Sequence, residues 1–214
     1  QIGLPEGSRV SLTLTPPAPS LASVRRKIAG NILSPKEYED IVADISARRY
    51  SNMDIASFLV AAGSFITPNE LLSLTEALRG DRIIDWGSEE IVADHHCLGE
   101  IPGNKADLIV TAIVAAYGLP MPKTVSRSLS GCTGAADTME ILAGTDLDVR
   151  SLKKQVLEKR GAIVNPEGLD IAAADKIISA VEQQNGLATL ERSIASVLAS
   201  KMAAGITHLL IDIP

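Results

Sequence analysis

The sequence of 214 residues contains few aromatic side chains, few cysteines and few histidines. Phenylalanine, tryptophan and tyrosine together make up 3% of the chain, whereas apolar residues make up 46%. The hydrophobic core must therefore be built mainly from aliphatic side chains. Both cysteines, Cys97 and Cys132, lie in glycine-containing segments. In a cytoplasmic chain we expect such thiols to stay reduced rather than to form a disulfide.

The sequence also lacks a basic run and a long apolar run. The formal net charge is −6 and the pI is near 5.1. Nucleic-acid binding requires clustered lysine and arginine side chains, so nucleic acid is not expected as a main partner. No apolar stretch is long enough to span a bilayer, and the N-terminus lacks the charged and apolar regions of a signal peptide. We therefore expect a cytoplasmic protein that does not bind membranes.

The hydrophobic pattern divides the chain into three parts. Residues 1–19 alternate like a β-strand and end in a proline-rich linker, which we interpret as the end of a preceding β-domain. Residues 20–80 have a helical period and predict a small helical domain. From residue 81 to 214, strand-like and helical segments alternate, which predicts a mainly parallel α/β layer that is incomplete at its C-terminus. The predicted fold class is therefore α/β.

Several helix starts carry capping signatures, and these allow the elements to be placed. Ser34-Pro35-Lys36-Glu37 and Thr67-Pro68-Asn69-Glu70 are capping boxes with proline at the first helical position. We expect helices at 21–29, 35–49, 52–61, 68–78, 108–116 (buried), 136–160 (with a break at 144), 170–183 and 187–204. We expect strands at 83–84, 91–92, 162–164 and 207–213 and one ending near 123, with 91–93, 162–164 and 207–213 in one sheet.

One segment contains most of the chemically active residue types: Asp94-His95-His96-Cys97-Leu98-Gly99-Glu100-Ile101-Pro102-Gly103-Asn104. It lies between a predicted strand and the predicted buried helix. A glycine-containing turn at this place presents backbone N–H groups at the helix start, which favours anions and phosphate above all. Ligands of open α/β sheets bind beyond the C-terminal ends of the strands. We therefore expect the active site here.

This segment resembles the thymidine phosphorylase and AMP phosphorylase family. Two later segments share the resemblance: Pro122-Lys123-Thr124-Val125-Ser126-Arg127 and Gly134-Ala135-Ala136-Asp137-Thr138-Met139-Glu140. The family has a D-K-H-[SC]-x-G-G-[x]-G-[DN] turn, then S-[SG]-R, then G-T-x-D-x-x-E. The cysteine and the P-G-N continuation are nearer to the AMP phosphorylase branch. The resemblance extends from Leu21 to Pro214. It implies a fragment of a longer chain that lacks the family's N-terminal β-domain and its C-terminal part.

The resemblance also implies an activity and the residues that carry it. The activity is phosphorolysis of the glycosidic bond of nucleosides or nucleoside 5′-monophosphates, with inorganic phosphate as co-substrate and no cofactor or metal. His96 matches the histidine of the family's turn and is the candidate catalytic residue. The candidate substrate and phosphate ligands are His95, Cys97, Gly99, Gly103, Asn104, Lys123, Ser126, Arg127, Asp137, Ser196, Ser200 and Lys201.

Several positions depart from the family pattern in ways that weaken a phosphate site. His95 stands where the family has a phosphate-binding lysine, and Glu100 replaces a glycine. Asp107, Val125 and Ala135 stand where the family has hydroxyl side chains. A carboxylate close to a phosphate costs on the order of a few kcal/mol. A second interpretation is therefore open, namely a catalytically inactive or repurposed homologue that binds a nucleotide-like ligand or acts as a structural subunit.

The positions that hold the nucleobase in the family are also altered. Ser196 is retained, but Ser200 stands where the family has a lysine, and Lys201 follows one place later. The family's upstream arginine aligns with Glu182. These differences leave the identity of the base open.

The same residue types permit other roles. Histidine, cysteine and carboxylate side chains suit zinc, so His95, His96, Cys97 and Glu100 could form a metal site. Adjacent ligands seldom close a tetrahedral site alone. Cys97 could be a nucleophile beside His96, or a plain buried thiol. Lys123 and Arg127 could be solvated loop charges, and Asp137 could simply be a favourable charge near a helix N-terminus.

The resemblance implies a homodimer or larger homo-oligomer that is joined through the helical domain. The helices at 20–29 and 51–62 offer apolar side chains for such a contact: Val24, Ile28, Ile55, Phe58 and Leu59. The same side chains could instead fill the core of the helical domain itself.

Overall fold

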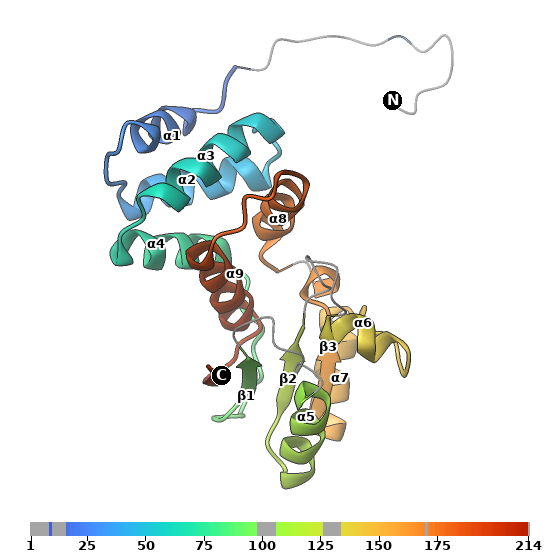
Figure 1. The fold of residues 1–214 in the computed structure, drawn as a ribbon. Coiled ribbons are helices and arrows are strands. Elements are labelled where there is room, and N and C mark those ends of the chain that lie inside the picture. Colours follow the sequence, from blue (N-terminus) through green and yellow to red (C-terminus); the bar gives the residue numbers. More distant parts are fainter. Residues whose placement is uncertain (1–8, 10–15, 98–105, 126–133, 170, 214) are drawn as a thin grey trace.

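Helices and short strands alternate along the chain, and Figure 1 shows how they are arranged. The computed structural model describes residues 9, 16–97, 106–125, 134–169 and 171–213. Four helices come first: α1 (Leu21–Ile28), α2 (Pro35–Ser46), α3 (Asn52–Ser64) and α4 (Pro68–Arg79). They are followed by β1 (Ala93–Cys97), α5 (Ala106–Tyr117), β2 (Met121–Thr124), α6 (Ala135–Glu140), α7 (Val149–Lys159) and β3 (Gly161–Val164). The last elements are the 3₁₀ helix η1 (Pro166–Leu169), α8 (Ala173–Asn185), α9 (Leu190–Ala203) and β4 (His208–Asp212).

The helix starts in the first part of the chain follow from their caps. The side chain of Ser34 accepts a hydrogen bond from the Glu37 N–H, and the Glu37 carboxylate accepts one from the Ser34 N–H. The same reciprocal pattern begins α3 at Ser51 and α4 at Thr67. Each box satisfies backbone donors that a helix start otherwise leaves unpaired. The predicted helices from residues 35, 52 and 68 are confirmed.

The helical part has an apolar core that includes α8 and α9 as well as α1 to α4. Val24, Ile55, Phe58 and Leu59 are buried in this core, whereas Ile28 is 56% exposed. Four of the five side chains that were considered for a dimer contact therefore fill the chain's own core. In Figure 1, α8 and α9 lie beside the first four helices although they come late in the sequence. The division into domains at residues 19 and 80 stays a prediction.

The strands pair in parallel, but among the described residues they form two separate two-stranded sheets. β1 pairs with β4, with Ala93 opposite His208, and β2 pairs with β3, with Met121 opposite Gly161. The expected sharing of one sheet is correct for 207–213 and wrong for 162–164. The arrowheads of β1, β2 and β3 point the same way in Figure 1.

The missing ladder between β1 and β2 has a cause in the sequence of β2. The N–H groups of Met121 and Val125 donate toward β3, to the carbonyls of Arg160 and Val164. Alternate residues face alternate edges, so residues 122 and 124 face β1. Pro122 has no N–H group, and the N–H of Thr124 donates to a side-chain oxygen of Asp94 at 3.4 Å. Within the described part of the chain, the two sheets therefore meet through one backbone bond, Ala93 N–H to Pro120 O, and through side chains.

Three further expectations need correction. Residues 94–97 lie in strand β1 rather than in a turn, because β4 supplies parallel partners as far as Cys97. Residues 83 and 84 are not in a strand. The helix expected to be buried, α5, packs one side on β2 and β3 and leaves Ile109 and Ile113 more than 60% exposed.

No helix within the described ranges is long and apolar enough to cross a membrane.

Glycine is required at one position where α9 leads into β4. Gly205 has φ = +73°, and a Cβ atom there would lie 2.0 Å from the carbonyl oxygen of Ile84. Only glycine accepts both the left-handed backbone and the close approach. The Trp86 indole N–H donates to the Ala204 carbonyl at 2.8 Å, which further fixes the end of α9.

A buried ion pair joins α1 to α4. The Lys27 Nζ atom donates to the Glu70 carboxylate at 2.5 Å, and both side chains are 1% exposed. The same carboxylate accepts from the Leu33 N–H and the Tyr38 hydroxyl. Burial alone would raise the pKa of Glu70, but the hydrogen bonds from Leu33, Lys27 and Thr67 outweigh it and lower the pKa to about 2.

We predict that Lys27→Met lowers the free energy of unfolding by about 3–5 kcal/mol, because it leaves a buried carboxylate without its cation. Urea unfolding followed by circular dichroism measures the change. The matched control is Lys36→Met, which removes the exposed ion pairs to Glu39 and Asp40 of a lysine side chain that is 72% exposed. This change should leave the unfolding midpoint unchanged. Equal effects of the two substitutions would contradict the prediction.

Candidate functional site

Charged side chains from β1, β2, α5 and α9 meet where the two sheets come together. We call this group the buried charge cluster: Asp94, His95, Asp107, Lys123, Thr124 and Lys201. All six residues are less than 9% exposed. Two lysines face two aspartates, so the formal charges of these four side chains balance. Buried charges of this kind are tolerated only when they are paired and hydrogen-bonded.

Asp94 is the most connected member of the buried charge cluster. Its Oδ2 atom accepts a hydrogen bond from the Lys201 Nζ atom at 2.6 Å, and it also faces the Thr124 N–H at 3.4 Å. Its Oδ1 atom accepts from the His95 N–H at 2.7 Å and lies 3.5 Å from the Lys123 Nζ atom. The Asp94 side chain is 0% exposed. The carboxylate therefore joins β1 to β2 and to α9.

The imidazole of His95 is held by Asp107. The His95 Nδ1 atom lies 2.8 Å from the Asp107 Oδ1 atom. The Lys123 Nζ atom lies 3.1 Å from the same carboxylate and donates to the His95 carbonyl. Lys123 is 1% exposed, so it is a buried cation and not a solvated loop charge. The Asp107 carboxylate thus binds both the histidine and the lysine.

The electrostatics of the cluster shift the pKa values of its neighbours. Burial and the nearby Lys201 and Lys123 cations lower the pKa of His96 to about 4. Burial also lowers the pKa of Lys201 to about 8, although Asp94 opposes the shift. At neutral pH His96 is therefore a neutral imidazole, which offers one N–H donor and one acceptor. Lys201 is mostly charged.

The structure gathers some of the candidate residues and separates others. His95, Lys123 and Lys201 lie in the buried charge cluster, and His96 lies within its field. Ser200 precedes Lys201 and is half-buried. Gly99, Gly103, Asn104, Ser126 and Arg127 lie outside the described residues.

Three other candidates have structural partners away from the cluster. Cys97 lies opposite Asp212 on β4, and burial together with that carboxylate raises the pKa of its thiol. Asp137 accepts a hydrogen bond from the Gly134 N–H at 2.9 Å, at the start of α6. Ser196 donates to Asp175 at 2.6 Å. The roles that the resemblance implies for these residues stay predictions.

A second polar group, which sequence reasoning did not identify, joins α8 to α9. Arg192 donates to the Asp175 carboxylate at 2.5 Å, and the same carboxylate accepts from Ser196. The Arg192 Nε atom lies 3.3 Å from a Glu182 oxygen, and burial raises the pKa of Glu182. Arg192 and Ser196 are four residues apart on one helix, which places them on the same face. This spacing is the sequence signal that could have indicated the polar group.

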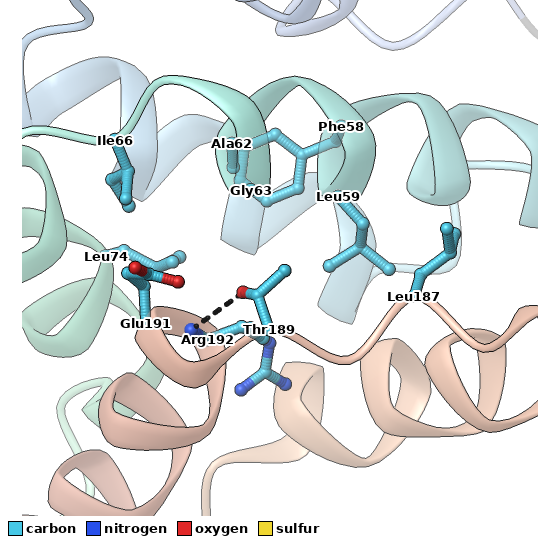
Figure 2. A pocket seen from close by; sticks show the side chains of 10 residues that line it. All are labelled: Phe58, Leu59, Ala62, Gly63, Ile66, Leu74, Leu187, Thr189, Glu191 and Arg192. Carbon is cyan, nitrogen blue, oxygen red and sulfur yellow. Dashed lines mark hydrogen bonds between the residues drawn. The ribbon is translucent and has the colours of Figure 1, made fainter.

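The first turn of α9 also borders a small apolar pocket, which Figure 2 shows from close by. Its walls are mainly aliphatic and aromatic side chains of the helical core: Phe58, Leu59, Ala62, Ile66, Leu74 and Leu187. The dashed line in Figure 2 is the hydrogen bond from the Arg192 N–H to Thr189 that caps the helix. The residues of the buried charge cluster do not line this pocket. Its apolar walls fit core packing better than phosphate chemistry.

Within the described ranges, no group of three or more histidine, cysteine, aspartate or glutamate side chains is placed to hold a metal ion. Glu100, one of the four residues considered for zinc, lies outside those ranges.

The fold matches that of a solved enzyme structure. The anthranilate phosphoribosyltransferase of Thermus thermophilus superposes with a TM-score of 0.74 over 89% of this chain and 58% of that one, at 18% sequence identity. At such low identity the likeness concerns the fold alone. Together with the parallel pairing, it places the chain in the α/β fold class.

Sequence comparison identifies the family. A protein of Bradyrhizobium diazoefficiens named "Putative thymidine phosphorylase" is 43% identical over 212 residues, which are 98% of this chain. A protein of Acidovorax named "Putative thymidine phosphorylase 2" is 44% identical over 216 residues. No family model matches the chain. The chain belongs to the thymidine phosphorylase family, and it spans 41–42% of the length of these curated relatives.

The depressed pKa of His96 predicts a pH dependence of folding. In the folded state the His96 imidazole stays neutral down to about pH 4. In the unfolded chain the same imidazole takes up a proton below its ordinary pKa of 6.5. The free energy of unfolding should therefore fall as the pH decreases from about 6.5 to about 4, by on the order of 2–3 kcal/mol from this group. Urea unfolding across this range, on the natural protein and on His96→Gln, isolates the contribution because other groups cancel in the difference. Parallel curves for the two proteins would rule out the depressed pKa of His96.

Proposed function

We propose that the intact protein containing this chain cleaves the glycosidic bond of a nucleoside or nucleoside 5′-monophosphate with inorganic phosphate. A phosphate oxygen forms a bond to C1′ as the bond between C1′ and the base nitrogen breaks. The base leaves with the electron pair of that bond and takes up a proton, and the products are the free base and a ribose phosphate. The homologues named for thymidine phosphorylase support this reaction class.

The observation that carries the proposal is the presence of two buried lysines at the place where the sheets meet. Lys123 and Lys201 are 1% and 3% exposed, so their fields are weakly screened by water. Phosphorolysis needs a held phosphate nucleophile and stabilisation of charge while the glycosidic bond breaks. His96 would serve there as a neutral hydrogen-bonding group, because its pKa is about 4.

The charge balance of the same cluster favours the second candidate function, a repurposed homologue that binds a nucleotide-like ligand without phosphorolysis. Asp107 neutralises Lys123 and also holds His95. Asp94 neutralises Lys201. A phosphate ion would therefore have to compete with carboxylates that already bind the available cations. We therefore propose that the phosphate site is weakened. The branch of the family, the homodimer and the cytoplasmic location stay predictions.

The assay that separates the two functions is phosphate-dependent release of base by the intact protein from nucleosides and from AMP, CMP and UMP. The phosphorolysis proposal predicts release that requires phosphate and is abolished by His95→Ala, which removes the imidazole that organises Asp107. Lys36→Met is the control and should retain full activity. No release from any of these substrates would favour the repurposed homologue.

The weakened phosphate site makes a separate prediction for Asp107→Ser. This change restores the family's hydroxyl and removes one negative charge beside Lys123, so phosphate should bind at least about tenfold more tightly. Calorimetric titration with phosphate, on the natural protein and on the variant, measures the difference. Asp40→Ser, on the exposed face of α2, removes the same charge far from the cluster and should leave the affinity unchanged. Unchanged affinity in Asp107→Ser would show that this carboxylate does not weaken phosphate binding.

A further inference from the structure

Helix α9 is the element that connects the two apolar cores of the chain. Its middle residues, Ala195 and Ala199, belong to the core of the helical part. Its last residue, Ala203, belongs together with Ala204 to the core around β3 and α7. Lys201 lies at the transition between these cores. The orientation of α9 at this point decides how the helical part and the strands sit relative to one another.

The Lys201 side chain links α9 to both sheets at once. Its Nζ atom donates to the Asp94 carboxylate on β1 at 2.6 Å and to the Thr124 carbonyl on β2 at 2.7 Å. The residue is 3% exposed, so it can act on a ligand through its electrostatic field but presents almost no surface for direct contact. One ammonium group therefore satisfies acceptors on two strands that lack a continuous backbone ladder between them.

We propose that Lys201 is a positioning residue, which fixes helix α9 against strands β1 and β2 and thereby sets the distance between polar groups on the helix and on the strands. This role differs from the direct ligand role that the resemblance implies. It rests on the proposed function only in so far as Ser196 and Ser200 on α9 and His95 on β1 contact substrates.

The role predicts a particular kinetic signature. If the helix and the strands hold different parts of the reacting pair, their relative placement sets the alignment of the reacting atoms. Loss of Lys201 should then lower kcat, while each substrate still binds its own group of residues and its KM changes little. A direct phosphate ligand would instead raise the KM for phosphate.

The experiment compares Lys201→Met, Lys201→Arg and the matched control Lys27→Met in the intact protein. Hydrogen exchange of peptides that cover β1 and β2, well below the unfolding temperature, measures the positioning without any substrate. Lys201→Met should accelerate exchange in both strands at least about tenfold. Lys27→Met should accelerate it in α1 and α4 instead, and Lys201→Arg should restore part of the protection, because its guanidinium can still donate to both acceptors.

The kinetic arm uses the nucleoside or nucleotide that gives the fastest base release. Lys201→Met should reduce kcat at least about tenfold, with both KM values within about threefold of the natural protein. Unchanged exchange in β1 and β2, or a selective rise in the KM for phosphate, would overturn the positioning role. If the natural protein releases no base, the proposed function fails, and the exchange measurement still decides the role of Lys201.

Discussion

The rest of the structure depends on the buried carboxylate of Asp94. It accepts hydrogen bonds from Lys201 and from the backbone of His95, and it faces Thr124 and Lys123 as well. Without these donors, a carboxylate that is 0% exposed would be strongly destabilising. With them, one side chain substitutes for the backbone ladder that Pro122 prevents. The two sheets and α9 are thereby fixed relative to one another.

The same interaction constrains the chemistry. Every lysine in the buried charge cluster already has an aspartate partner. This pairing is the basis of the weakened anion site that we propose. In this proposal Asp107 is the most important residue, because it binds both Lys123 and His95.

Local signals predicted the local structure well. The capping boxes at Ser34 and Thr67 placed α2 and α4, and the alternation of strands and helices predicted parallel pairing. The sequence could also have indicated the break between the sheets, since Pro122 lies in the middle of a strand. The errors arose where tertiary contacts decide. Residues 94–97 became a strand because of β4, and 83–84 remained outside a strand although both residues are apolar.

The candidate site was only partly predictable. The motif located His95, His96 and Lys123, because those residues lie beside recognisable sequence patterns. It did not indicate that Asp94 pairs with Lys201, since 107 positions separate them and no local period connects them. It also missed the Arg192 and Asp175 pair, which forms only when α8 and α9 pack together.

A double-mutant cycle on Asp94 and Lys201 measures how far these two buried side chains depend on one another. The free energy of unfolding is measured for the natural protein, Asp94→Asn, Lys201→Met and the double variant. The structure predicts a coupling energy of about 2 kcal/mol or more, because each single change leaves a buried partner unsatisfied and the double change does not. Additive effects within about 0.5 kcal/mol would show that the two side chains do not depend on one another, and would contradict the central role of Asp94.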